Sequence, residues 1–209
     1  MRRVVYASSS SVYGDTAELP KHEDMPVSAR SPYAAGKLAG EAYCRAFSQV
    51  YSLETVCLRF FNVFGPRQDP ASQYAAVVPR FINRMLAGAP AEVTGDGRQT
   101  RDFTFVDNAV QACRLDAAAG PEAVGEAMNV GCGDRLSVVG LVELVNDLLE
   151  ERVEPIFVPA RAGDVRDSQA AVAKAERLIG YRPRVPVREG VAGTLEWFAA
   201  NTIKGVSAR

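Results

Sequence analysis

The chain has 209 residues, of which 47% are hydrophobic and 23% are charged, and its formal net charge at pH 7 is −1. This balance gives no electrostatic reason to expect nucleic acid or an anionic membrane as a partner. We expect neither a membrane span nor a signal peptide, because no apolar run approaches the ~20 residues that cross a bilayer. The four cysteines stand far apart, so we expect no metal site, no disulfide framework and a cytoplasmic location.

Strand-like and helix-like segments alternate along the chain, and this alternation predicts an α/β fold. The expected strands cover residues 3–8, 55–61, 92–94, 103–106, 127–130 and 155–158. The expected helices cover residues 32–50, 78–87, 107–119, 137–150, 171–179 and 187–200. Ser137 suits the N-cap of its helix, and the last helix carries an apolar stripe that suits burial.

Four serines, residues 8–11, end the first expected strand and precede Val12-Tyr13-Gly14. A serine in such a run is most often only the polar end of a strand. This run, however, lies about two dozen residues before Tyr33 and Lys37. It could therefore supply a hydroxyl beside the same substrate oxygen.

Tyr33 and Lys37 stand four residues apart in the helix expected over residues 32–50. Ser31 suits the N-cap, and Pro32 suits the first helical position, where its missing N–H costs nothing. Residues at i and i+4 share one helix face, so the phenol and the ammonium point the same way. A tyrosine is a poor base at neutral pH unless a neighbouring positive charge stabilises its phenolate. The pair therefore makes Tyr33 a candidate base.

Serine, tyrosine and lysine in this order resemble the catalytic set of the short-chain dehydrogenase/reductase superfamily. Three later segments resemble its extended branch, the nucleotide-sugar epimerases and dehydratases: residues 58–67, 95–103 and 163–166. The resemblance runs from residue 1 to about residue 200. It implies the C-terminal part of a Rossmann-like parallel sheet, together with a smaller interleaved α/β domain that caps the substrate. The sheet domain would comprise residues 1–66 and 103–131, and the cap residues 67–102 and 132–209.

The resemblance also implies a cofactor and a catalytic set. NAD would take a hydride from the sugar, with Ser9, Tyr33 and Lys37 as the catalytic residues. Alignment on Val12-Tyr13-Gly14 selects Ser9, and its neighbour Ser10 stays open. The cofactor contacts that the resemblance implies are Tyr33, Lys37, Phe60 and Phe61.

A UDP-sugar is the substrate that the resemblance implies, in an enzyme closest to the UDP-glucose and UDP-N-acetylglucosamine 4-epimerases. The implied substrate contacts are Ser9, Ser10, Asn62, Ala76, Val77, Thr94, Arg101, Arg161, Asp164 and Ser168. Ser168 falls where epimerases restricted to non-acetylated sugars carry a bulky side chain, so its small size leaves room for an N-acetyl group. A homodimer is expected for the full-length form.

Two other enzymatic readings compete with this one. A nucleotide-sugar dehydratase would carry Asp-Glu immediately before Val-Tyr-Gly, where this chain has Ser10 and Ser11. Epimerases and decarboxylases that act on UDP-glucuronate stay open, because the contacts to a sugar carboxylate cannot be located in this sequence.

Family members open with a Gly-rich turn that binds the dinucleotide pyrophosphate, and this sequence contains no such turn. Its nearest counterpart, Gly131-Cys132-Gly133, has Leu136 at the third glycine position and is expected to be a strand-to-helix turn. We expect an N-terminally truncated form, with Met1 standing at an internal GTG valine codon of a longer gene. A gene fragment or one half of a split protein are the alternatives. The chain by itself is expected to be inactive, or at most a weak binder of UDP-sugar.

Overall fold

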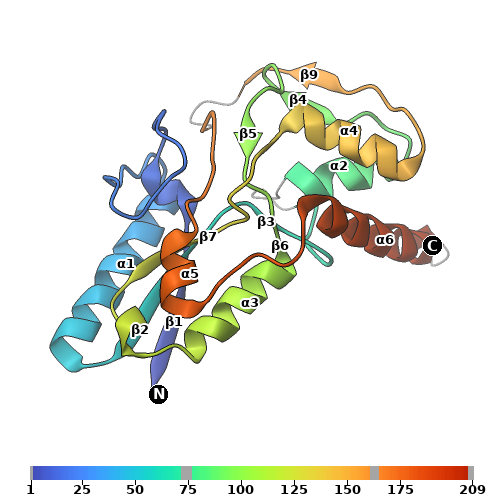
Figure 1. Cartoon of the computed structure of the whole chain (residues 1–209). Helices are drawn as coiled ribbons and strands as arrows, with labels where there is room; N and C mark the ends of the chain where they lie inside the picture. Colours follow the sequence, from blue (N-terminus) through green and yellow to red (C-terminus); the bar gives the residue numbers. More distant parts are fainter. Residues whose placement is uncertain (1, 72–76, 161–164, 207–209) are drawn as a thin grey trace.

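The computed structural model describes residues 2–71, 77–160 and 165–206 and contains every predicted helix and strand (Figure 1). The strands are β1 (Arg3–Ser9), β2 (Glu54–Phe60), β3 (Val63–Phe64), β4 (Glu92–Thr94), β5 (Thr100–Arg101), β6 (Thr104–Phe105), β7 (Ala127–Val130), β8 (Leu136–Ser137) and β9 (Ile156–Val158). The α-helices are α1 (Pro32–Tyr51), α2 (Val77–Leu86), α3 (Val106–Ala117), α4 (Val138–Leu149), α5 (Ala173–Ile179) and α6 (Val187–Val206). Two 3₁₀ helices, η1 (Ser10–Tyr13) and η2 (Pro121–Ala123), and the short strands β3, β5 and β8 are additions to the prediction.

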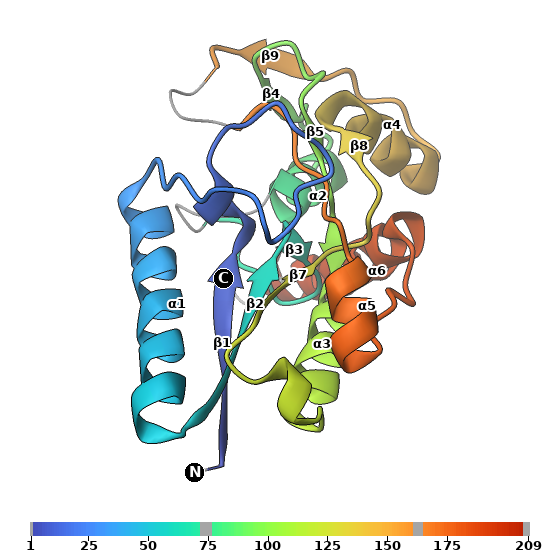
Figure 2. The same ribbon diagram turned by 60° about the vertical axis from the view of Figure 1, so that its left-hand side comes forward.

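A three-stranded parallel sheet in the order β1-β2-β7 forms the larger part of the molecule. Helix α1 packs against β1 and β2 from one side, and α3 and α5 lie on the opposite side of the sheet (Figure 2). Strand β2 is almost wholly buried between these layers, and its Val56 and Leu58 are fully enclosed. The sheet and its helices confirm the predicted α/β class with a Rossmann-like parallel sheet.

Helices α2, α4 and α6 pack together beside the sheet around a second hydrophobic core (Figure 1). The apolar stripe expected on the last helix enters this core through Val191 and Phe198. Strands β4 and β9 pair in parallel at the far edge of this part. Arg101 on β5 and Ser168 after β9 share a cavity with the carboxyl ends of β1 and β2, the edge at which a parallel sheet holds its ligand.

Side-chain caps fix the starts of two helices as predicted. The Ser31 hydroxyl accepts a hydrogen bond from Ala34 N at 3.1 Å, and Pro32 occupies the first position of α1. The Ser137 hydroxyl accepts from Gly140 N at 2.9 Å at the start of α4. Each cap satisfies one of the backbone N–H groups that a helix start leaves free.

The expected start of α5 at residue 171 is wrong by two residues. Ala171 N donates to Lys21 O at 2.8 Å, so residue 171 is held in extended backbone beside Lys21. The helix begins only at Ala173.

Strand β1 is partly exposed along most of its length and, among the described residues, pairs only with β2. No helix within the described ranges is long and apolar enough to cross a membrane.

Candidate active site

A cavity of about 640 Å³ opens at the carboxyl ends of β1 and β2. This is the edge of a parallel sheet at which ligands bind. Its lining includes most of the predicted site residues: Ser9, Ser10, Tyr33, Lys37, Phe60, Phe61, Asn62, Arg101 and Ser168. Residues that lie up to 159 positions apart in the chain therefore share one concave surface.

Lys37, on α1, lines the cavity together with Tyr33. Its Nζ donates to Ala7 O at 2.8 Å and lies 5.6 Å from the centroid of the Tyr33 ring. The helical i, i+4 relation thus brings the ammonium and the phenol together as predicted. Tyr33 is half exposed at 50%, so its ring faces the open cavity instead of a packed core.

Ser9 is the last residue of β1 and caps the short helix η1. Its hydroxyl oxygen accepts from Ser11 N at 3.2 Å and from the Ser11 hydroxyl at 3.0 Å. A hydroxyl has two lone pairs and one hydrogen, so this arrangement leaves the Ser9 hydrogen for another acceptor. Ser8, its neighbour, is buried and donates instead to Glu41. The geometry is that of a donor at the cavity wall.

Asn62 and Ser168, which also line the cavity, form a hydrogen-bonded pair. Asn62 Nδ2 donates to Ser168 Oγ at 3.1 Å and to Asp102 O at 3.1 Å. Asn62 adopts a positive φ of 33°, a conformation that is uncommon outside glycine and is more frequent in asparagine than in most residues. Arg101 lies nearby, and its guanidinium donates to Thr100 O at 2.9 Å and Arg166 O at 3.0 Å.

Two further predicted substrate contacts, Thr94 and Val77, do not line this cavity. Thr94 lies in a smaller neighbouring cavity of about 170 Å³, which shares Val165 with the main one. Val77, at the start of α2, packs against the hydrophobic core of α2, α4 and α6. Ala76, Arg161 and Asp164 lie outside the described residues.

Asp102 is a functional candidate that the sequence reading did not single out. Its carboxylate is fully buried and accepts three backbone hydrogen bonds, from Cys132 N at 2.7 Å, Gly133 N at 3.0 Å and Ala170 N at 3.0 Å. Burial raises the pKa of Asp102 to about 6, while these three donors oppose the shift. The residue joins the end of β7 to the wall that carries Ser168.

The hydrogen bonds to Asp102 also determine whether Gly131-Cys132-Gly133 can bind a phosphate. Its N–H groups at residues 132 and 133 already donate to a carboxylate, so they are not available to a phosphate. A side chain at Gly131 would meet the Ala170 Cβ at 2.6 Å and an Asp102 oxygen at 2.8 Å, so glycine is required there for close approach. The prediction of a strand-to-helix turn is confirmed.

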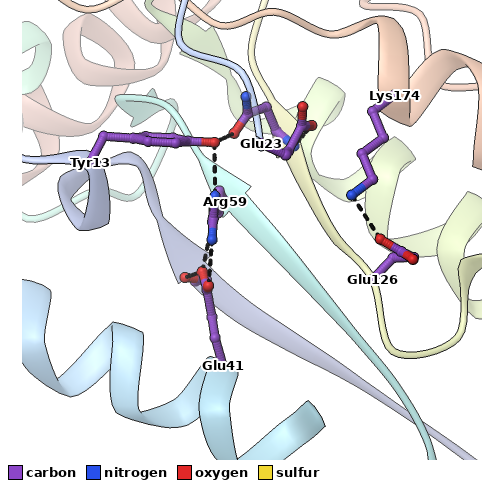
Figure 3. A network of polar contacts seen from close by, with 8 residues as sticks. Tyr13, Glu23, Glu41, Arg59, Glu126 and Lys174 are labelled. Atoms are coloured by element: carbon purple, nitrogen blue, oxygen red, sulfur yellow. Dashed lines mark hydrogen bonds and ion pairs between the residues drawn. The ribbon is translucent and has the colours of Figure 1, made fainter. Parts of the chain in front are cut away.

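Glu41 and Arg59 were also not identified as functional candidates from the sequence. They form a buried ion pair beneath α1, drawn at the centre of Figure 3. The available signal was positional, because Glu41 continues the four-residue spacing of Tyr33 and Lys37 along one helix face.

Comparison with known proteins identifies the relatives of this chain. The signature of the NAD dependent epimerase/dehydratase family matches residues 1–131. The chain belongs to that family. A UDP-glucose 4-epimerase of Mycolicibacterium smegmatis is 42% identical to it over 199 residues, which cover 95% of this chain and 63% of the relative.

Two solved structures of this family have nearly the same fold. A UDP-N-acetylglucosamine 4-epimerase from Methanobrevibacter ruminantium, in complex with UDP-N-acetylmuramic acid, superposes with a TM-score of 0.91 at 36% identity, covering 96% of this chain and 64% of that one. A UDP-glucose 4-epimerase from Thermotoga maritima, with UDP-glucose, gives 0.92 at 34% identity, covering 97% and 65%. The family member described here thus spans somewhat less than two thirds of the length of these relatives.

Proposed function

We propose that this chain carries the catalytic residues of an NAD-dependent UDP-sugar 4-epimerase of the UDP-N-acetylglucosamine/UDP-glucose type. The observation that carries the proposal is the convergence of Ser9, Tyr33 and Lys37 on one cavity that Ser168 also lines. Relatives and solved structures with UDP-sugar 4-epimerase activity in their names support it.

Each catalytic residue has a role that follows from its position. Tyr33 takes the proton of the sugar 4-hydroxyl, and the Lys37 ammonium stabilises the phenolate that this requires. Ser9 donates its hydroxyl hydrogen to the same sugar oxygen. NAD, when bound, supplies the acceptor for the hydride of the adjacent ring carbon. Once the hydride has returned to the opposite face of the same carbon, Tyr33 gives the proton back to the sugar oxygen, and the cycle closes without an external reductant.

The described residues fit the nicotinamide end of NAD. Phe60 ends β2 and Phe61 follows it, and both line the cavity together with Lys37 and the carboxyl end of β1. This sequence contains no Gly-rich turn that could bind the pyrophosphate. Gly131-Cys132-Gly133 cannot replace such a turn, because its N–H groups at residues 132 and 133 donate to Asp102. We therefore place only Tyr33, Lys37, Phe60 and Phe61 against the cofactor.

The diphosphate of the substrate needs cations and N–H donors. Arg101, on the wall beside Asn62, is placed to supply one cation. Ala76, Arg161 and Asp164, which lie outside the described residues, and Thr94 and Val77 stay proposed contacts. We keep the division into a sheet domain (1–66, 103–131) and a cap (67–102, 132–209) as part of this proposal.

A homodimer is proposed for the full-length form. Helix α1 exposes the apolar side chains Tyr43 (69%), Phe47 (44%) and Val50 (69%), which recur at the spacing of one helix face. Exposed apolar patches of this kind are typical of interaction sites.

A nucleotide-sugar dehydratase is the second candidate function, because a dTDP-glucose 4,6-dehydratase is 32% identical to this chain. The chain has Ser10 and Ser11 where a dehydratase would carry Asp-Glu, and this difference favours epimerisation over dehydration.

The proposal is tested by comparing two proteins. One is the 209-residue chain, and the other is a form extended upstream to include the Gly-rich cofactor-binding segment, which we call the extended form. We expect the extended form to purify with nucleotide absorbance and to interconvert UDP-N-acetylglucosamine with its 4-epimer. We expect the shorter chain to be aggregation-prone and inactive, because β1 is partly exposed along most of its length. Lack of turnover of every UDP-sugar by the extended form would refute the proposed activity.

We predict that Ser168 determines how large a sugar the enzyme accepts. This side chain is buried, lines the cavity and accepts from Asn62. In the extended form, Ser168→Tyr should lower turnover of UDP-N-acetylglucosamine far more than that of UDP-glucose, because the phenol fills the space for the N-acetyl group. Ser168→Ala is the control, since it removes the Asn62 acceptor without adding volume and should affect both substrates alike. Equal loss on both substrates with the tyrosine variant would exclude Ser168 as the gate.

A further inference from the structure

Glu41 on α1 and Arg59 on β2 form a buried ion pair between the proposed catalytic helix and the sheet. Glu41 follows Lys37 by four residues and Tyr33 by eight, so the three share one face of α1. Both carboxylate oxygens of Glu41 accept from Arg59 on β2, Oε1 from Nε at 2.9 Å and Oε2 from Nη2 at 2.7 Å. The Glu41 and Arg59 side chains are only 9% and 6% exposed. This two-point geometry holds α1 at one height over the sheet.

One end of the pair reaches the catalytic strand. The Ser8 hydroxyl donates to Glu41 Oε1. Ser8 is the residue before Ser9, and the Lys37 ammonium binds Ala7 O on the same strand. Glu41 and Lys37 therefore attach α1 to two consecutive residues of β1, immediately before the serine that faces the cavity.

The other end of the network reaches the segment that follows Ser168. Arg59 Nη1 donates to the Tyr13 hydroxyl at 2.9 Å (Figure 3). That hydroxyl donates in turn to Asn129 Oδ1 at 2.7 Å. Asn129 Nδ2 donates in turn to Lys21 O at 2.8 Å and Ala171 O at 3.3 Å. A continuous chain of hydrogen bonds thus joins the catalytic helix and strand to the segment that follows Ser168.

A stabilising role alone does not explain this arrangement. A buried ion pair contributes little stability relative to well-packed apolar residues of similar volume, although removal of one partner is costly. Its distinctive property is a fixed geometry, because each group has defined partners in a medium of low dielectric constant. Catalysis needs such precision, since an error of ~1 Å can lower a rate ~10²-fold.

We propose that Glu41 and Arg59 are positioning residues that set Ser9 relative to Tyr33 and Lys37 for proton transfer. The proposal rests on the proposed epimerase function. It assigns the pair no contact with substrate: Glu41 and Arg59 act through Ser8 and through the seating of α1 on β1 and β2.

The experiment separates positioning from stability by replacing the pair singly and together in the extended form. Glu41→Leu or Arg59→Met alone leaves a buried charge without its partner and should lower the Tm by about 10 °C. The double variant Glu41→Leu/Arg59→Met should recover most of that Tm. We expect its kcat to stay about 10²-fold below wild type with KM little changed. A UDP-sugar deuterated at C4 should show a larger kinetic isotope effect on the double variant than on the wild type.

A matched control uses the other ion pair of Figure 3. Lys174 Nζ and Glu126 Oε2 lie 2.7 Å apart, and neither residue lines the cavity. The variant Glu126→Leu/Lys174→Met should keep the wild-type kcat and isotope effect. Recovery of both Tm and kcat in the Glu41/Arg59 double variant would overturn the positioning proposal and leave a structural pair.

A second measurement keeps this test independent of the assigned activity. If the wild-type extended form turns over no UDP-sugar, the proposed function fails, and the positioning proposal is then decided by crystal structures of the wild type and the double variant. Displacement of the Lys37–Ala7 contact and of the Ser9 hydroxyl in the variant would support it. An unchanged arrangement of these groups would overturn it.

Discussion

Tyr33→Phe is expected to abolish sugar epimerisation by the extended form while leaving UDP-sugar binding nearly intact. The substitution removes only the phenolic oxygen, the group that we propose takes the proton of the sugar hydroxyl. Loss of a general base lowers rates by ~10²–10⁴-fold. The ring remains, and so do the proposed substrate contacts Arg101, Asn62 and Ser168, which line the same cavity. The rate should therefore fall while the dissociation constant for the UDP-sugar changes little.

The measurement is turnover of UDP-N-acetylglucosamine and UDP-glucose, with calorimetric titration of the same substrates. Tyr51→Phe provides the control, since Tyr51 stands at the far end of the same helix and is 71% exposed. It should retain wild-type turnover. If Tyr33→Phe kept more than a few per cent of activity, Tyr33 would be removed from the role of base.

Asp102→Ala is expected to cause the largest loss of stability. The substitution leaves the N–H groups of Cys132, Gly133 and Ala170 without their buried acceptor. Each unsatisfied buried donor costs ~1–3 kcal/mol. A total of at least ~3 kcal/mol is large against the ~5–15 kcal/mol by which folded domains are stable. The wall that carries Ser168 should loosen as well, so turnover by the extended form should fall.

Urea unfolding of the extended form, with and without the substitution, measures this loss. Asp147→Ala is a suitable control, because Asp147 is exposed on α4 and pairs only loosely with Arg188 at 3.5 Å. It should change the free energy of unfolding by no more than ~0.5 kcal/mol. A loss no larger than that of the control would show that the Asp102 contacts contribute little.

The pH dependence of the same measurement follows from the pKa of Asp102, which burial raises to about 6. The folded chain then holds the Asp102 proton more tightly than the unfolded chain does. The stabilisation that comes from this tighter proton binding is fully present below about pH 4 and is lost as the pH rises through about 6. The difference in unfolding free energy between wild type and Asp102→Ala should therefore be larger at pH 5 than at pH 7. A difference that grew with pH would contradict the raised pKa.

Features that depend only on residues close together in the chain could be predicted from the sequence alone. The helix starts at Ser31 and Ser137 follow from a hydroxyl reaching an N–H three residues ahead, and such contacts need no tertiary structure. The Tyr33–Lys37 pair follows from the pitch of a helix in the same way. The motifs along the chain resembled one family, and membership of that family is confirmed. The assignment of catalytic and substrate roles stays a prediction.

Which charged side chains are buried, and which groups they bind, depends on the tertiary structure and could not be predicted from the sequence. Asp102 and Ala170 are 68 residues apart, and Arg59 and Tyr13 are 46 apart, so no local pattern distinguishes them from ordinary surface residues. The late start of α5 has the same origin, because the backbone of Ala171 binds Lys21 instead of continuing the helix. A buried polar group takes its partner from whichever segment packs beside it, and that choice is made by the fold.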